Sequence, residues 1–451
     1  MPQRSSSTGR DGTAGAFIRN PERNIGVFLN VDRIERQGDR VRLIGRFFRN
    51  TEETTLAEGV YDQSSDRLSI SIPNRGGTYD FARADDDPDS SFYARGKDPG
   101  AYRYLPPSNE PDGWPTARLE DVGISSEPVK DLIERVVYPA AESVDSPYIH
   151  GLLIARHGKL VLEEYFYGFH RQKPHDSRSA SKSLTSILVG AAILDGAPLD
   201  ASSPVYQTIF GADLPPDIYA RKKRLTVEHL LTMSSGFHCD DRDPAAPGSE
   251  DVMQEQTGEP DWYRYTLRLP MIADPGTTPV YCSANANLLG AVLSAATGRT
   301  LEELFQALIA GPLQIRRCYL DLQPTGQPYM GGGIHWLPRD FMKLGQVLLN
   351  EGTWNGRRII SREWARRSIA PLVELRDKPY GYLWWLMDYP LRGKTVRAFF
   401  AGGNGGQLVM GIPELDLVVA FFAGNYGSPV MYRIQEDLVP RYILPAVDAT
   451  E

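Results

Sequence analysis

The sequence has few cysteines, no long apolar run and no excess of basic residues. Cys239, Cys282 and Cys318 are its only cysteines, and they form neither a CxxC pair nor a metal-ligand spacing. We therefore expect three buried thiols, without a disulfide framework or a zinc site. No apolar run approaches the length that spans a bilayer, so we expect no membrane contact. Acidic residues outnumber basic ones by 57 to 49, which argues against a nucleic-acid partner.

The amino-terminal residues give expectations about order and compartment. Residues 1–22 are rich in Ser, Gly and Arg and are predicted to be disordered. Their beginning, MPQRSSSTGRDGTAG, has no apolar stretch typical of an export signal. The protein is therefore expected in the cytoplasm, or in the periplasm or outside the cell if a signal has been removed.

Residues 23–107 alternate between apolar and polar positions. In RLSISIP, for example, Leu68, Ile70 and Ile72 fall on one face of an extended chain. Several short runs of this kind predict an all-β antiparallel domain. The Pro-rich stretch YLPPSNEPDGWP breaks the pattern and predicts a linker at residues 108–115. No catalytic constellation is visible in this domain, so we expect it to be a lid or a scaffold.

Residues 116–451 mix strand and helix patterns. HGLLIARHGKLVLEEYF predicts a hairpin that turns at His157 and Gly158, and LVMGIPELDLVVAFFAGN predicts two strands joined by a Pro-containing turn. Between them, the helix pattern TLEELFQALIA opens with the capping-box residues Thr300 and Glu303. The expected fold class is therefore α/β, in which a sheet is closed by strands from both ends and a helical region is inserted.

One short motif indicates catalysis. SRSASKSLTS, residues 177–186, places Ser179 three residues before Lys182 at the start of an apolar helical pattern. Residues three apart share a helix face, so the lysine amine can approach the serine hydroxyl. The positive end of the helix favours an alkoxide on Ser179 and disfavours a charged Lys182. A neutral, partly buried amine can act as a general base.

Four further blocks follow in a fixed order. They are RLTVEHLLTMSSGF, ADPGTTPVYCSANANLLGAVLSAATG, YGYLWWL and FFAGGNGGQLVMGIPELDLVV. With these blocks, residues 113–445 resemble the serine β-lactamase and penicillin-binding-protein superfamily, in its class C-like branch with esterases and nylon-oligomer (aminohexanoate-dimer) amidases. The resemblance implies a β-lactamase-like fold, with an antiparallel sheet flanked by helices, and an acyl-enzyme mechanism that needs no metal or cofactor.

The resemblance also implies roles for individual residues. Ser179 corresponds to the nucleophile and Lys182 to its proton acceptor. The Tyr-x-Asn block of the family falls on Tyr281, Cys282 and Ser283, so Tyr281 corresponds to the second acid–base group. Without the surrounding match, a packed aromatic at a helix entry would be the simpler interpretation of Tyr281.

The Lys/His-Thr-Gly strand of the family falls on Asn404, Gly405 and Gly406. The resemblance implies that the backbone N–H groups of Ser179 and Gln407 form the oxyanion hole. Glycines suit this place because the backbone must approach the substrate closely. A tight turn or bulge between strands is the alternative interpretation of these glycines.

Two departures from the family pattern bear on the substrate. Ser283 stands where penicillin-recognising members usually carry Asn, and neutral Asn404 stands where a cation is common. A serine hydroxyl cannot replace a carboxamide, and Asn404 offers no charge to a carboxylate. Arg397 and Lys394 are the candidate cations that would compensate from the same neighbourhood. We therefore expect a small neutral or differently placed amide or ester in preference to a β-lactam.

Other residues have simpler structural interpretations. His157 is expected in a turn and His229 as a packed or capping residue. We expect Asp240-Asp241 and Asp261-Trp262 in solvated loops, with a substrate cleft as the alternative. The pair Trp384-Trp385 fits either a pocket wall or the core.

Two alternatives to a small-molecule serine hydrolase remain open. The same pair, Ser179 and Lys182, would serve a β-lactamase or a D-alanyl-D-alanine peptidase, against which the missing export signal and Asn404 argue. The other alternative is a non-catalytic binding protein with the same fold. The presence of Ser179, Lys182 and Tyr281 together argues against it, because a scaffold has no physical need for all three.

Overall fold

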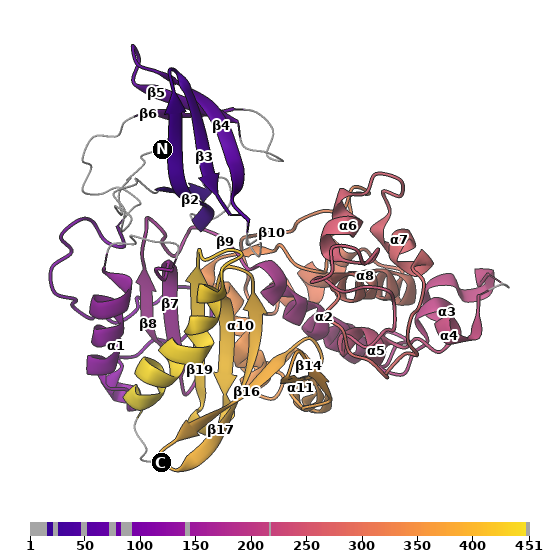
Figure 1. Cartoon of the computed structure of the whole chain (residues 1–451). Coiled ribbons are helices and arrows are strands. Elements are labelled where there is room, and N and C mark those ends of the chain that lie inside the picture. Colours follow the sequence, from indigo (N-terminus) through magenta and orange to yellow (C-terminus); the bar gives the residue numbers. More distant parts are fainter. Residues whose placement is uncertain are drawn as a thin grey trace.

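The computed structural model of the chain contains an amino-terminal sheet and a larger α/β part (Figure 1). It describes residues 16–20, 26–46, 52–71, 78–82, 93–139, 145–215 and 218–447. Within these ranges, no helix combines the length and the apolar character needed to cross a membrane.

The amino-terminal sheet has six antiparallel strands that pair in sequence order. These strands are β1 (Ala16–Asn20), β2 (Gly26–Gln37), β3 (Arg40–Gly45), β4 (Thr54–Asp62), β5 (Arg67–Ser71) and β6 (Thr78–Ala82). Its small core includes Leu43, Leu56 and Ile70, which confirms the predicted all-β region; Ile72 lies outside the described residues.

The expected disordered segment is wrong where it includes β1. The backbone of this strand pairs with β2 between Ala16 and Val31, so its polar groups have partners that a Ser- and Gly-rich composition does not reveal. The remaining part of that prediction, residues 1–15, lies outside the described residues.

The Pro-rich stretch before the larger part packs against it. The indole N–H of Trp114 donates to the carbonyl oxygen of Arg339 at 2.9 Å, and Asp112 forms an ion pair with the Arg339 guanidinium at 2.8 Å. The Trp114 ring also meets Trp354 edge-on, with ring centroids 4.9 Å apart. The carboxyl-terminal end of the proposed linker is therefore fixed in place.

The larger part is built on an eight-stranded antiparallel sheet with the order β14-β15-β16-β17-β18-β19-β7-β8. Its strands are β7 (Ile149–Arg156), β8 (Lys159–Tyr165), β14 (Val373–Leu375), β15 (Lys378–Tyr380), β16 (Trp385–Leu391), β17 (Lys394–Gly403), β18 (Gln407–Ile412) and β19 (Leu417–Ala423). Strands from both ends of this part are therefore neighbours, as predicted, because β19 pairs with β7.

The predicted turns also appear in this sheet. β7 and β8 are joined at His157 and Gly158, whose φ values of 53° and 68° fit a tight hairpin turn. Pro413–Leu415 form a short 3₁₀ turn between β18 and β19.

Helices cover both faces of this sheet. One face carries Leu152 and Ile154 of β7 in a core shared with α1 (Ser126–Leu132) and the π-helical segment η8 (Ile434–Ile443). The other face carries Leu153 and Ala155 in a core shared with α2 (Lys182–Leu194) and α10 (Pro338–Leu349). β7 is thus buried on both sides, which explains its continuous apolar sequence.

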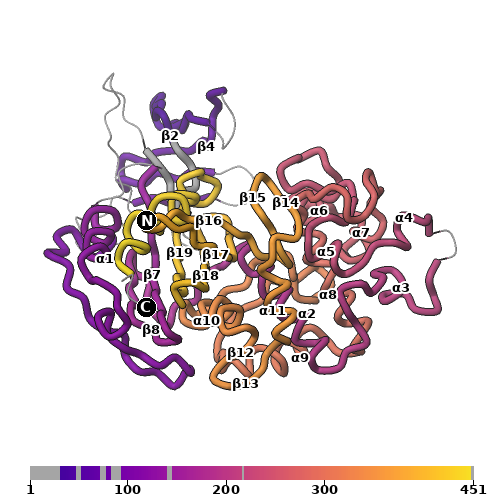
Figure 2. Tube along the Cα trace, turned by 90° about the horizontal axis from the view of Figure 1, so that it is seen from below, coloured from indigo at the N-terminus to yellow at the C-terminus, as the bar shows by residue number. Residues whose placement is uncertain are grey.

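A helical insertion lies on the side of the molecule opposite α1 (Figures 1 and 2). Its helices are α3 (Val205–Phe210), α4 (Ala220–Lys223), α5 (Val227–Leu231), α6 (Glu250–Glu255), α7 (Trp262–Arg268), α8 (Ser283–Thr297) and α9 (Leu301–Phe305). The capping box of α9 is confirmed, because Glu303 N–H donates to Thr300 and Thr300 N–H donates to Glu303. In α11 (Arg362–Ser368), the indole N–H of Trp364 donates a hydrogen bond to the Ser186 carbonyl oxygen of α2 at 3.0 Å.

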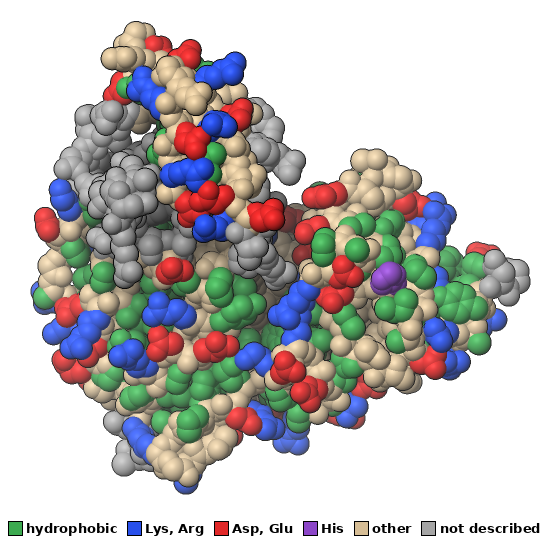
Figure 3. Space-filling view, viewed as in Figure 1, with side chains coloured by type: hydrophobic (Ala, Val, Ile, Leu, Met, Phe, Trp, Pro, Cys, Tyr) green, Lys and Arg blue, Asp and Glu red, His purple; other side chains and the backbone are tan. Residues whose placement is uncertain are grey.

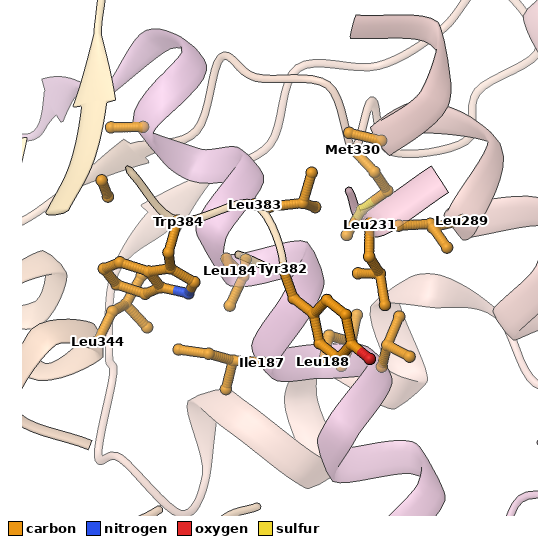
Figure 4. Close-up of a cluster of buried hydrophobic side chains, with 14 of the residues drawn as sticks. Leu184, Ile187, Leu188, Leu231, Leu289, Met330, Leu344, Tyr382, Leu383 and Trp384 are labelled. Atoms are coloured by element: carbon orange, nitrogen blue, oxygen red, sulfur yellow. The ribbon is translucent and has the colours of Figure 1, made fainter. Parts of the chain in front are cut away.

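Helix α2 joins the sheet to the insertion. Its residues Leu184, Ile187 and Leu188 are almost completely buried. Figure 4 shows them within a cluster that includes Leu231 and Leu289 of the insertion and Tyr382, Leu383 and Trp384 of the segment before β16. A helix that is buried around most of its circumference is held firmly by its neighbours. This packing fixes the position of Lys182 at the amino end of α2.

The expectation of three free thiols is wrong. Cys239 and Cys282 form a disulfide with their Cα atoms 5.6 Å apart, and Cys318 is free. Burial raises the pKa of the Cys318 thiol to about 11. The two paired cysteines are 43 residues apart, so their pairing depends on the fold of the insertion and not on a local motif.

Candidate active site

The Ser179–Lys182 pair lies where the chain enters α2. Ser179 is in a 3₁₀ turn, Arg178–Ser181, and Lys182 is the first residue of the α-helix. The Lys182 Nζ donates a hydrogen bond to the Ser179 Oγ at 2.9 Å. Arg178, with φ of 50°, is in the left-handed region, and its N–H donates to Asp176 at 2.8 Å. The nucleophile candidate is therefore presented by a sharply bent backbone.

Tyr281 approaches the same pair from the insertion. The Lys182 Nζ lies 5.1 Å from the centroid of the Tyr281 ring. The ring also stacks on Trp385, with centroids 5.8 Å apart, and Tyr281 is 9% exposed. The structure thus brings together the three residues that the sequence singled out, although Tyr281 lies far from the other two in the chain.

The charge of Lys182 differs from the expectation. Burial alone would lower the pKa of its amine, but Tyr281 and the carboxyl groups of Glu250 and Asp241 outweigh burial, so the pKa of Lys182 is raised. Lys182 is therefore an ammonium at neutral pH. The expected neutral amine is wrong because the two carboxyl groups come from a loop and a helix that no local spacing connects to Lys182.

Asp241 and Glu250 form a partly buried acidic pair beside the site. Asp241 accepts hydrogen bonds from the Ser283 N–H at 2.9 Å, the Ser283 hydroxyl at 2.6 Å and the Glu250 N–H at 3.0 Å. Glu250 accepts from the Tyr329 hydroxyl at 2.6 Å. Burial, together with the charge of Glu250, raises the pKa of Asp241 to about 6. Asp241 therefore lines a pocket, which is the alternative expected for it, and does not lie in a solvated loop.

Ser283 does not take the place expected for it. Its side chain is buried, and its hydroxyl donates to Asp241 at 2.6 Å instead of facing the pocket. Asp241 needs donors because a buried carboxyl group is costly without them. The prediction of Ser283 as a substrate-binding residue is not supported by this geometry.

A pocket of about 750 Å³ opens in front of Ser179 and Tyr281. Its apolar wall consists of Trp385, Phe400, Leu408, Met431 and Tyr432. Trp384, the neighbour of Trp385, is fully buried in the core. A cavity of this size fits a small molecule, with space for an apolar group beside the nucleophile.

The turn between β17 and β18 forms another wall of the pocket. It contains Asn404, Gly405 and Gly406, and the glycines have φ values of 94° and 95° that favour glycine. The Asn404 carboxamide accepts from the Gly427 N–H at 2.8 Å, and the Gln407 side chain donates to the Ala423 carbonyl at 2.7 Å. Both side chains brace the turn, and Asn404, Gly406 and Gln407 line the pocket with Ser179.

Gly403 allows this turn to approach the nucleophile. A Cβ atom at Gly403 would lie 2.3 Å from the Ser177 carbonyl oxygen and 3.0 Å from the Ala180 nitrogen. Both are backbone atoms of the segment that carries Ser179, and a fixed backbone cannot move away without displacing the nucleophile.

We expect Gly403→Ala to lower kcat/KM for ester hydrolysis by about 100-fold, because a small misplacement of reacting groups has an effect of this size. The adjacent Gly402→Ala is the matched control, since its Cβ would meet only side-chain atoms, the nearest at 3.4 Å. Steady-state kinetics and thermal melts of both variants provide the measurement. Equal activities would show that this close approach has no role.

The cations expected to compensate for Asn404 lie elsewhere. Arg397 pairs with Asp388 at 2.7 Å on the sheet, and Lys394 is exposed at the hairpin end of β17. The pocket instead receives Arg376 and Lys378 from the β14–β15 turn, and Arg242 from the insertion. Sequence reasoning missed Arg376, although it lies only four residues before the YGYLWWL block.

Most of the structural interpretations are confirmed. His157 lies in the β7–β8 turn and pairs with Asp416 at 3.0 Å. His229 completes the capping box of α5 with Thr226. The expectation of a solvated loop is wrong for Asp261-Trp262, because Asp261 caps α7 by accepting from two backbone N–H groups and Trp262 is buried in that helix. Within the described ranges, no three His, Cys, Asp or Glu residues gather in a way that could hold a metal ion.

This chain is similar in sequence to known proteins. The family model described as Beta-lactamase matches residues 147–438. A 6-aminohexanoate-dimer hydrolase from Paenarthrobacter ureafaciens is 28% identical over 268 residues, which are 57% of this chain and 67% of that protein.

Two solved structures share the fold. One, from Bacillus anthracis, is provisionally described as a 6-aminohexanoate-dimer hydrolase; it is 19% identical, with a TM-score of 0.55 over 74% of this chain and 88% of its own. The other is a variant of the simvastatin synthase of Aspergillus terreus, which is 18% identical, with a TM-score of 0.53 over 72% of this chain and 98% of its own.

Proposed function

Because the chain belongs to the Beta-lactamase family, whose model spans residues 147–438, we propose that it is a serine hydrolase that cleaves amide or ester bonds of small molecules. The reaction proceeds through an acyl-enzyme on Ser179. The observation that carries the proposal is the 2.9 Å contact between the Lys182 Nζ and the Ser179 Oγ in a pocket that Tyr281 also lines.

Acylation begins with attack of the Ser179 Oγ on the substrate carbonyl carbon. The Lys182 ammonium cannot accept the serine proton while it is charged, so Lys182 and Tyr281 act as a unit. The phenol oxygen of Tyr281 accepts the Ser179 proton as the Tyr281 hydroxyl proton passes to the leaving group, and the Lys182 ammonium stabilises the negative charge that develops on both oxygens. Tyr281 therefore takes the role of proton acceptor that the sequence assigned to Lys182 alone, and Lys182 supports it with its charge.

The backbone N–H groups of Ser179 and Gln407 stabilise the oxyanion that forms on the carbonyl oxygen. The braced turn around Gly405 and Gly406 supports this role, because donors held in place need no reorganisation during the reaction. Water then attacks the acyl-enzyme, its proton returns through Lys182 and Tyr281, and the carboxylic acid leaves with Ser179 restored.

Linear amides and esters are the proposed substrates. The relative from Paenarthrobacter ureafaciens is named for the hydrolysis of a 6-aminohexanoate dimer, which supports a linear amide. The buried Ser283 and the neutral Asn404 do not offer the groups that penicillin-recognising relatives usually present. Basic and acidic side chains are interspersed on the face shown in Figure 3, which supports a small molecule over nucleic acid.

The proposal is tested with short-chain 4-nitrophenyl esters, N-acyl anilides and a chromogenic cephalosporin. We expect turnover of the esters and anilides and little turnover of the cephalosporin. Faster hydrolysis of the cephalosporin would favour a β-lactamase or D-alanyl-D-alanine peptidase. A folded protein that turns over none of the three would favour the binding-protein alternative.

The disulfide bears on the compartment. We propose an oxidising compartment in place of the cytoplasm, because the Cys239–Cys282 pair persists in such surroundings and is rare in the cytosol. We expect the protein purified without reductant to show one thiol when unfolded, from Cys318, and three after reduction. Thiol titration provides the count. Three thiols before reduction would contradict the disulfide and support the cytoplasm instead.

A further inference from the structure

The β14–β15 turn brings a cation to the candidate active site. Its two central residues, Arg376 and Asp377, have φ values of 52° and 60°, in the left-handed region that is strained for arginine. Leu375 and Tyr380 on either side are each 1% exposed, so packing holds the turn in this conformation. The Arg376 side chain is therefore placed at the pocket by a rigid, strained backbone.

Arg376 lies against the proposed acid–base group. Its guanidinium carbon is 4.4 Å from the centroid of the Tyr281 ring. The Arg376 Nη2 lies 4.0 Å from the Asp240 carboxylate, and the Arg376 side chain is 24% exposed. For comparison, the exposed pair of Arg397 with Asp388 is 2.7 Å long. The Arg376 guanidinium is thus largely removed from water and has no short contact to Asp240.

Arg242 also lines the pocket but is exposed, and water weakens the contact of an exposed cation with a ligand. Apart from Arg376, the remaining charged groups of the pocket are engaged with the protein. Lys378 pairs with Glu436 at 3.4 Å. The Asp241 oxygens accept from Ser283 and the Glu250 N–H, as described above. Arg376 is consequently the charged group best able to meet a ligand, because a planar guanidinium binds a carboxylate with two parallel hydrogen bonds.

The position of Arg376 indicates which half of the substrate it meets. In the proposed reaction, Ser179 retains the acyl half as the acyl-enzyme, and Tyr281 passes a proton to the amine or alcohol that leaves. We propose, resting on the proposed function, that Arg376 binds a carboxylate carried by the leaving half of the substrate. Preferred substrates are then acyl amides of amino acids and acyl esters of hydroxy acids. Hydrolysis breaks the acyl–N or acyl–O bond, with water supplying a hydroxyl group to the acyl half and a hydrogen to the other.

Two chromogenic esters that differ in one carboxylate test this inference. The butyrate ester of 5-hydroxy-2-nitrobenzoic acid carries a carboxylate on its leaving group, and 4-nitrophenyl butyrate does not. We expect Arg376→Gln to lower the ratio of their kcat/KM values by about 10- to 100-fold relative to the unmodified protein, the range typical of a lost charged hydrogen bond. Arg376→Lys keeps part of the ratio, and Arg397→Gln, which removes a cation outside the pocket, leaves it unchanged. A ratio in Arg376→Gln within twofold of the original would overturn the inference.

A second measurement needs no variant. In the unmodified protein, 5-hydroxy-2-nitrobenzoate should inhibit hydrolysis of 4-nitrophenyl butyrate competitively and at least tenfold more strongly than 4-nitrophenol. Equal inhibition by the two phenols would also overturn the assignment of Arg376. A folded protein that hydrolyses neither ester contradicts the proposed function instead. Binding of 5-hydroxy-2-nitrobenzoate, followed by calorimetry in the unmodified protein and Arg376→Gln, then decides whether Arg376 is an anion site.

Discussion

Replacement of Ser179 by alanine is expected to lower kcat for short-chain esters by about 10⁴-fold or more, the loss typical of removing a catalytic nucleophile. The Ser179 Oγ is the atom in hydrogen-bond contact with the Lys182 amine at 2.9 Å, and Ser179 lines the pocket. Steady-state kinetics on 4-nitrophenyl butyrate measure the effect. Because Ser179 is half-buried in a surface turn, we expect the melting temperature to change little.

Ser186→Ala is the matched control for this variant. Ser186 is buried in α2, the helix that follows the turn with Ser179. Its hydroxyl lies 3.5 Å from that of Ser368, at the limit of a hydrogen bond. We expect Ser186→Ala to keep its activity within a few-fold. If Ser179→Ala retained activity within tenfold of the unmodified protein, another residue would have to be the nucleophile.

Replacement of Lys182 by methionine is expected to have the second largest effect. The change removes the group that stabilises charge on Ser179 and Tyr281, and we expect kcat to fall by about 10³-fold. It also leaves the carboxyl groups of Asp241 and Glu250 without their cation. Loss of this nearby positive charge should lower the free energy of unfolding by about 1 kcal/mol at neutral pH, the equivalent of roughly one pKa unit.

The loss of stability in Lys182→Met should depend on pH. Burial raises the pKa of Asp241 to about 6 in the folded protein, above its value in the unfolded chain. The contribution of Asp241 to the free energy of unfolding is therefore fully present below the unfolded pKa, and it is lost as the pH rises through about 6. Without Lys182 this pKa rises further. The difference in melting temperature between the two proteins should therefore grow as the pH is raised from about 5 to 8.

Lys182→Arg separates the two effects. It keeps a positive charge beside Asp241 and Glu250 but changes the geometry at Ser179, because a guanidinium is planar and larger than an ammonium. We expect Lys182→Arg to lose activity and to keep most of the stability that Lys182→Met loses between about pH 5 and 8. A Lys182→Met variant with kcat within tenfold of the original would contradict the role given to Lys182.

Local patterns were sufficient for the elements whose contacts are close in sequence. The Ser179–Lys182 spacing predicts their contact because both lie on one helical turn, and the β7–β8 hairpin follows from alternating residues around His157 and Gly158. The position of Tyr281 needed more than local reasoning. It followed from the family resemblance, because its approach to Lys182 depends on how α8 packs on α2.

Features that depend on tertiary contacts were missed or misplaced. The Cys239–Cys282 disulfide and the acidic neighbours of Lys182 arise from the folding of the insertion onto α2. Asp241 was expected in solvent, yet the donors of Ser283 and Glu250 allow its burial. Arg376 carries no motif, and only the β14–β15 turn brings it to Tyr281.

The measurement that tests the account most directly is intact-mass spectrometry after exposure to a fluorophosphonate, followed by peptide mapping. The account predicts one adduct per chain on the peptide that contains Ser179, and none in Ser179→Ala. Ser186→Ala should be labelled as completely as the unmodified protein. An adduct at another residue, or no adduct on the folded unmodified protein, would contradict the assignment of Ser179 as the nucleophile.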